Sequence, residues 1–390
     1  MRTGIATIPL DYGKCPRWLF ERMKRLSRAI ALAIVEEFGP EELLRRLAHP
    51  IWFQSLGCVI GFDWNSSGLT TTTLGAFKAG LFDIQDYLGV YVCGGKKESR
   101  KTPEEITAYT LSRGLPFGQD LIYASKMAAK VDSALLQDNY QIYQHNFLFT
   151  KKGHWVVIQQ GMNVFNQTAR RYHWLSDNVK NFVEEPHSGI IAAKRVKALN
   201  LVAKESQLNK QISTELVKEE PKTFLKDFKL VLEKNAIKKP EPNYGIFRNS
   251  LMERKKMAGF CEMELKNVEF SHHPVEKEKF DLKRLEKTIW LAHEQKPANF
   301  EQLLSLKGIG PKTIRALSLV AELVYGSPPS YEDPARYSFT VGGKDGTPYF
   351  VERDTYDALL KTIEKGIEKA KVSFKEKNEA KLRLNKLCLK

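Results

Sequence analysis

The chain has 390 residues and a mass of 44.6 kDa, a length typical of two or three domains. A hydrophobic fraction of 42% and an aromatic fraction of 11% exclude a wholly disordered chain. The 61 Lys and Arg residues outnumber the 46 Asp and Glu residues by 15, which favours a polyanionic partner such as nucleic acid.

The sequence predicts a cytoplasmic protein without a membrane segment. Its start, MRTGIATIPLDYGKCPRW, lacks the apolar stretch of a signal peptide. The longest apolar run, residues 29–35, is far shorter than the roughly 20 residues that span a bilayer. The five cysteines are scattered and form no CxxC pair, so neither a zinc knuckle nor a disulfide framework is expected.

Hydrophobic spacing predicts helices and strands mixed in the first half of the chain. Residues 18–47 have helical spacing with a break at Gly39-Pro40, and residues 70–81 are a further helix. Residues 56–63 and 90–93 are apolar runs that we expect to be buried strands. Residues 103–143 are mostly helical, and a β-hairpin follows, pairing residues 147–149 with residues 155–158.

These elements predict an α+β domain over residues 1–193, followed by a mainly α-helical C-terminal domain. Residues 194–243 are rich in Lys and Glu, which predicts a charged connector. Residues 244–390 have a helical pattern throughout and form the second domain, in which residues 299–324 predict a helix-hairpin-helix. The last 30 residues carry ten Lys and Arg against four Glu; they predict a solvated helix that would add salt-dependent affinity if it lay near DNA.

The helix-hairpin-helix is the most specific local signal. Asn299 with Gln302 is a capping box for its first helix, and Pro311 suits the first turn of the second. Between them stands LKGIGPKT, in which Gly308 and Gly310 remove side chains where a backbone must approach a phosphate.

The amides of this turn and the N-terminus of the second helix would then bind the anion, with Lys312 and Thr313 beside it. Such contacts do not depend on base sequence, so the motif predicts binding to the DNA backbone. The alternative is a plain helical hairpin with a glycine turn.

A second candidate anion site is the loop GGKKESRKTPEE at residues 94–105. Thr102 as N-cap, Pro103 and Glu105 mark the start of the following helix. The spacing of a Walker loop is absent. The loop could clamp phosphates or could be a solvated basic turn, with the four cations Lys96, Lys97, Arg100 and Lys101 in either case.

The richest polar segment is predicted to run as one helix over residues 129–145. Asp132 and Asp138 lie within reach of one helical face and are candidate ligands of a divalent metal ion, Mg or Mn. The β-hairpin that follows adds candidate catalytic and phosphate-binding side chains: His145, Gln160, Arg170, Arg171 and His173. Carboxylates, amides and arginines together suit phosphodiester hydrolysis. The alternative is a helix with a hydrated polar face.

Asp63 is the remaining catalytic candidate. It ends the apolar run VIGFDW, a position where nucleases that use two metal ions place a first carboxylate. It could equally cap the turn at residues 65–68.

Several blocks of the sequence resemble a known family. They are RTGIATIPLDYGKCPRWLFERM, GFDWNSSGLTTT, GGKKESRKTPEEI, KVDSALLQDNYQIYQH with VVIQQGMN, and DPARYSFTVGGKDGTP. The family is domain of unknown function 763, found in prokaryotes, many of them thermophilic; the resemblance implies no function. Residues 299–324 also resemble the helix-hairpin-helix of DNA-repair proteins.

From these features we expect a DNA-binding repair protein, foremost a metal-dependent endonuclease whose catalysis resides before residue 190. An alternative is a DNA glycosylase with lyase activity. Its amine would be that of Lys312, assisted by Asp333, since Lys can form a Schiff base with an abasic sugar. A third hypothesis is a DNA-binding adaptor without catalysis.

Overall fold

The computed structural model describes residues 15–62, 67–96, 101–192, 195, 197–236, 280–335, 364–368 and 372–388. The first helices are α1 (Arg17–Phe38), α2 (Pro40–Ala48), α3 (Pro50–Val59), α4 (Ser67–Leu81) and the short α5 (Gln85–Leu88). After strand β1 come α6 (Thr102–Ser112) and α7 (Gly118–Ala134). The later helices are α8 (Gln207–Lys218), α9 (Pro221–Ala236), α11 (Leu282–Gln295), α12 (Phe300–Ser305), α13 (Pro311–Leu323) and α15 (Phe374–Cys388).

Among the described residues, five strands form one antiparallel sheet in the order β1-β3-β4-β5-β6. They are β1 (Val90–Lys96), β3 (Gln141–Thr150), β4 (Trp155–Asn163), β5 (Thr168–Leu175) and β6 (His187–Ile191). A separate pair joins β2 (Leu136–Gln137) to β7 (Leu199–Asn200). The predicted strand at 90–93 and the hairpin of residues 147–149 with 155–158 are confirmed.

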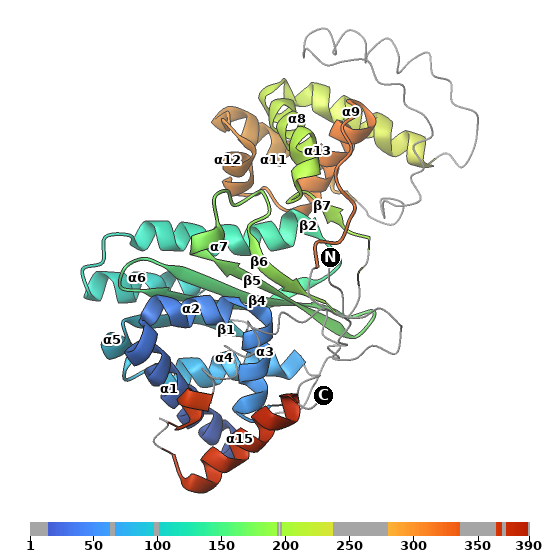
Figure 1. The fold of residues 1–390 in the computed structure, drawn as a ribbon. Helices are drawn as coiled ribbons and strands as arrows, with labels where there is room; N and C mark the ends of the chain where they lie inside the picture. Colours follow the sequence, from blue (N-terminus) through green and yellow to red (C-terminus); the bar gives the residue numbers. More distant parts are fainter. Residues whose placement is uncertain are drawn as a thin grey trace.

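The sheet is the middle of three layers (Figure 1). Leu148 and Ile158 project from one face into a core made with α1 to α4. Phe147 and Val157 project from the other face toward α6 and α7. Successive side chains of a strand point to opposite faces, so strands covered on both sides are apolar at nearly every position.

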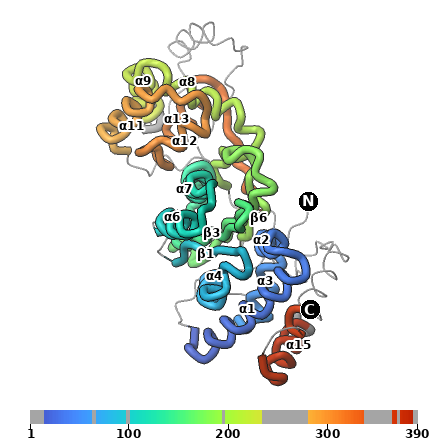
Figure 2. The backbone as a smooth tube through the Cα atoms, turned by 90° about the vertical axis from the view of Figure 1, so that its left-hand side faces the viewer, coloured from blue at the N-terminus to red at the C-terminus, as the bar shows by residue number. Residues whose placement is uncertain are grey.

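A fourth layer of helices, α8, α9, α11, α12 and α13, lies beyond α7 (Figures 1 and 2). Its buried residues, such as Ile212, Phe228 and Leu317, belong to the same hydrophobic cluster as the α7 face of the sheet. Residues 194–243 were predicted as a charged connector, but their described part supplies α8 and α9 to this layer. Most of their described Lys and Glu lie on outer faces, while an apolar stripe at helical spacing packs inward. The exception is the buried Lys210, which donates to the carbonyl of Val183 at 2.8 Å.

The C-terminal helix α15 packs on the opposite side of the molecule, against α1 and α3 (Figures 1 and 2). Leu384 and Ala380 enter the core of the N-terminal helices. Glu376 accepts a hydrogen bond from Arg25, and Arg383 Nε donates to the carbonyl of Val59 at 3.1 Å. The basic tail was predicted to belong to the C-terminal helical domain; its described end instead completes the N-terminal helical layer.

Two predicted elements are wrong. The apolar run at residues 56–63 is not a strand, because residues up to Val59 belong to α3. Gly57 lets α3 approach α4 closely, since a Cβ there would lie 2.6 Å from Leu69 Cγ. The helix predicted over residues 129–145 ends at Ala134, so Asp132 and Asp138 do not share a helical face. Short apolar runs do not by themselves separate a buried helix from a buried strand.

We predict that Leu384→Ala lowers the free energy of unfolding by about 2–4 kcal/mol, because it leaves a cavity in the core of the N-terminal helices. The matched control is Leu382→Ala on the same helix, which should change it by no more than about 0.5 kcal/mol. Leu384 is 1% exposed and Leu382 is 60% exposed. Urea denaturation followed by circular dichroism measures both. Equal effects would show that α15 is not packed in solution as described.

Candidate functional site

The polar residues of β3, β4 and β5 lie at paired positions in the middle of these strands and divide between the two faces of the sheet. Gln159 and Gln160 are adjacent in β4, as are Arg170 and Arg171 in β5, so the members of each pair point in opposite directions. All four are at most 1% exposed. The sheet therefore divides the cluster that the sequence predicted into two groups on opposite faces. Both arginines are buried, so a DNA backbone approaching from solvent would not reach them.

Asp132 is the centre of the polar group on the α7 face. Its carboxylate accepts hydrogen bonds from Gln159 Nε2, from Trp174 Nε1 at 3.0 Å and from His187 Nε2. The side chain is fully buried. Three protein donors thus occupy the oxygens that a metal ion would need.

His145 extends this group toward α7. Its Nδ1 lies 2.8 Å from Gln159 Oε1, and its Nε2 lies 2.9 Å from Ser125 Oγ. Because the amide oxygen can only accept, Nδ1 carries the proton and Nε2 accepts from the serine. Burial lowers the pKa of His145, outweighing the effect of the Gln159 hydrogen bond, so the ring is neutral. Ser125 is also buried, which leaves this serine–histidine pair without access to a substrate.

Arg170 forms a buried ion cluster with two carboxylates. Its NH1 lies 2.8 Å from Asp138 Oδ2, and its NH2 lies 2.6 Å from Asp333 Oδ2. Tyr172 donates a further hydrogen bond to Asp138 at 2.7 Å, and the guanidinium stacks on the ring of Tyr140. The two carboxylates come from segments far apart in sequence, so the cluster fixes the chain after α13 against β5.

Arg171 occupies the opposite face, between α3 and α4. Its guanidinium donates to His173 Nε2 at 2.9 Å, to Thr70 Oγ1 at 3.1 Å and to Gln54 Oε1 at 2.9 Å. Thr70 in turn donates to Gln160 Oε1. Burial and the neighbouring Arg171 cation lower the pKa of His173 well below its usual range. This network satisfies buried polar groups and joins the N-terminal helices to the sheet.

The two glycines predicted to form a loop, Gly94 and Gly95, belong to β1, and strand packing explains the first of them. Gly94 has φ +80, and a Cβ there would lie 2.2 Å from the carbonyl oxygen of His145. Glu105, predicted to complete a capping box, instead accepts from Gly94 N at 2.6 Å and from Lys78 Nζ at 2.6 Å. Thr102 is the first residue of α6 rather than its N-cap, a position held by Lys101 without a side-chain cap.

Of the four predicted cations, the two that the structure describes are exposed: Lys96 at the end of β1 and Lys101 just before α6. Lys96 Nζ lies 6.0 Å from the ring of Tyr143. Lys97, Arg100 and the catalytic candidate Asp63 lie outside the described residues.

The hairpin of α12 and α13 is open where its glycines lie. The predicted cap is confirmed: Asn299 Oδ1 accepts from Gln302 N at 2.9 Å, and Pro311 begins α13. Gly308 has φ +91, a conformation that favours glycine. Gly310 has φ −139, and a Cβ there would meet nothing within 4 Å.

Between the glycines, Ile309 is 2% exposed and inserts into the helical core. Lys307 and Lys312, on either side, are exposed, whereas Thr313 is buried. No acceptor is bound to the amides of Gly308, Ile309 or Gly310 within the described part of the chain. Ile309 thus anchors the glycine turn in the helical core, and Lys307 and Lys312 lie exposed on either side of it.

Three contacts fix this hairpin along α7. Tyr123 donates to Glu301 Oε1 at 2.7 Å. Lys130 Nζ donates to the carbonyl of Leu306, just before the glycines, at 2.6 Å. Gln137, just beyond α7, donates to the carbonyl of Pro311 at 2.9 Å and accepts from Arg315. Burial lowers the pKa of Lys130 to about 8. The sequence pattern gave no sign of these contacts.

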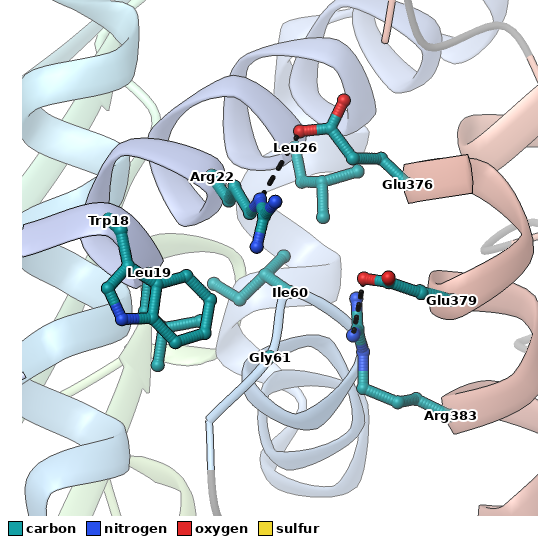
Figure 3. A pocket seen from close by; sticks show the side chains of 9 residues that line it. All are labelled: Trp18, Leu19, Arg22, Leu26, Ile60, Gly61, Glu376, Glu379 and Arg383. Carbon is teal, nitrogen blue, oxygen red and sulfur yellow. Dashed lines mark ion pairs between the residues drawn. The ribbon is translucent and has the colours of Figure 1, made fainter. Parts of the chain in front are cut away.

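A cavity of about 300 Å³ lies between α15 and the start of α1 (Figure 3). Arg22 lies over the ring of Trp18 at 5.1 Å and pairs with Glu376 at 3.7 Å. Arg383 pairs with Glu379 at 3.9 Å. Each arginine of the cavity therefore faces a carboxylate, and the balanced charge does not select an anion.

Neither predicted metal ligand fits a divalent ion, since Asp132 is closed by three donors and Asp138 by Arg170 and Tyr172. In the ranges that the structure covers, no group of three or more His, Cys, Asp and Glu side chains is arranged to hold a metal ion. Nor does any helix in those ranges combine the length and the apolar character needed to cross a bilayer.

Comparison with known proteins identifies the family. A family model described as "protein of unknown function (DUF763)" matches residues 4–351, nearly nine-tenths of the chain. The chain belongs to the DUF763 family. No curated protein and no solved structure matches it.

The buried histidines of this DUF763 protein predict a loss of stability in acid. The ring of a histidine in the unfolded chain has a pKa of about 6.5. His145 and His173 have lower values when folded, so below about pH 6.5 the unfolded chain binds protons that the folded chain does not. Each histidine then lowers the free energy of unfolding by up to about 1.4 kcal/mol per pH unit as the pH falls.

Chemical denaturation at several pH values between 7 and 5 measures this slope. His145→Gln should make it shallower, because the variant has no ring to be protonated at this position. A slope unchanged by His145→Gln would contradict the neutral, buried ring.

Proposed function

We propose that this DUF763 protein binds double-stranded DNA through its phosphate backbone, with the α12–α13 hairpin acting as a helix-hairpin-helix. Amides of the glycine turn and the positive N-terminal end of α13 would receive a phosphate, and Lys307 and Lys312 would add charge. Contacts of this kind do not read bases, so the binding would be independent of sequence.

The observation that carries this proposal is Gly310. Its φ of −139 is open to any residue, and a Cβ would enter empty space. The fold therefore gives no steric reason for glycine at this position. A ligand that approaches the backbone closely gives such a reason, because a side chain would occupy its place. The net charge of +15 favours an anionic ligand.

The proposal is confined to binding, because no comparable observation supports catalysis. The carboxylates of Asp132 and Asp138 are buried and occupied by protein donors. The lyase alternative required Asp333 to assist Lys312, but the Asp333 side chain is 2% exposed and bound to Arg170. Neither set of groups is open to a DNA strand in the described fold.

We predict that Gly310→Val weakens binding to a duplex at least about tenfold, which corresponds to about 1.4 kcal/mol. The added side chain would stand where the phosphate approaches, and the backbone conformation tolerates it. Gly310 is a cleaner test than Gly308, whose φ of +91 would strain a valine and disturb the turn itself. Fluorescence anisotropy with a labelled duplex measures the affinity of each variant.

The matched control is Ala298→Val, an exposed position just before α12 and away from the turn in sequence, which should bind like the wild type. Thermal unfolding of both variants checks the fold. The wild-type affinity should fall linearly with the logarithm of salt concentration. Wild-type affinity in a folded Gly310→Val variant, or an affinity that salt does not change, would overturn the proposal.

A further inference from the structure

The way in which the hairpin is held on α7 bears on the shape of the DNA that it would bind. The contacts from Tyr123, Lys130 and Gln137 extend along most of α7, so α12 and the glycine turn lie beside this helix as one fixed unit. Lys130 reaches the carbonyl of Leu306, two residues before Gly308. The surface next to the turn is therefore contributed by α7 and belongs to the sheet layer.

One flank of α7 is buried and one is open at this junction. Met127 and Val131 are at most 2% exposed and pack into the core that α7 shares with the helical layer. Lys126 and Ser133 are exposed and lie on the other side of the line through Tyr123 and Lys130. The exposed residues of α7 at this junction are therefore on the Lys126 flank, and the glycine turn beside α7 is exposed as well.

Two exposed lysines carry positive charge at this junction. Lys126 and Lys307 have no ion-pair partner among the residues described, and both are exposed. The carboxylate of α12 that faces α7, Glu301, is held by the hydroxyl of Tyr123. Cations without carboxylate partners on the open side of a fixed junction suit a polyanion.

We infer that α7 supplies a second row of phosphate contacts, Lys126 and Ser133, so that the hairpin and α7 together bind one double-stranded DNA. This inference rests on the proposed function of the hairpin and extends its binding surface onto the sheet layer. Lys126 and Ser133 are seven residues apart, about 10 Å along the helix, which matches about three base-pair steps of a duplex.

A duplex fits this surface better than a single strand. Two rows of contacts at a fixed separation require a partner whose phosphates are also fixed in space. Surfaces for single strands present aromatic side chains on which bases stack. The open flank of α7 instead carries Lys126 and Ser133 with the partly buried Ala129. The exposed aromatic nearest to it, Tyr123, is held by its hydroxyl to Glu301.

The test is the salt dependence of duplex binding by the full-length chain. Each phosphate contact contributes about 0.9 to the slope of log affinity against log salt concentration. Lys126→Ala should therefore lower the magnitude of this slope by about 0.9 and weaken binding at low salt. The matched control is Lys226→Ala, an exposed lysine on α9, which should leave the slope unchanged. Lys126→Glu should lower affinity further than Lys126→Ala.

The outcomes separate this inference from the function on which it rests. If Gly310→Val weakens binding but Lys126→Ala has the slope of Lys226→Ala, the hairpin binds DNA and the α7 row is wrong. If the wild type binds a single strand as tightly as a duplex, with the same loss in Lys126→Ala, the assignment to a duplex is wrong. If the wild type shows no salt-dependent binding at all, both proposals fail.

Discussion

The architecture depends on one buried guanidinium, that of Arg170, held between Asp138 and Asp333. A charge in this position is stable only while its carboxylates remain, since breaking such a pair costs about 3–5 kcal/mol. Asp138 follows α7 and Asp333 follows α13, so the cluster ties the chain on both sides of the helical layer to strand β5. The backbone contact between Asn200 and Ser330 lies close by in sequence and reinforces this tie.

This tie and the shared hydrophobic core give the α12–α13 hairpin a fixed place. Its core is continuous with the α7 face of the sheet, and three polar contacts align it along α7. A surface loop on a flexible linker would lose entropy when it bound a rigid ligand, whereas a docked loop has already lost it on folding. The buried polar residues of the sheet therefore stabilise the fold, while the exposed glycine turn is the proposed DNA-binding element.

The polar cluster shows why the first interpretation of the site failed. Adjacent amides and adjacent arginines suggest groups that act together, and they would do so on a loop. In a buried antiparallel strand the members of each pair point to opposite faces. Gln160 and Arg171 therefore reach α3 and α4, whereas Gln159 reaches α7 and Arg170 reaches Asp138 just after it. This division follows only when helices cover both faces of the sheet, and those helices come from segments that are distant in sequence.

The sequence by itself determined the features that depend on neighbouring residues. The Asn299 cap, Pro311 at the start of α13, the break at Gly39 and the strand at 90–93 all follow from local conformational preference and hydrogen bonding. Tertiary structure alone decided which charges are buried, which helices form the helical layer and that α15 returns to the N-terminal helices. Those outcomes depend on partners such as Asp333, 163 residues from Arg170, because burial is a property of the packed chain and not of any short segment.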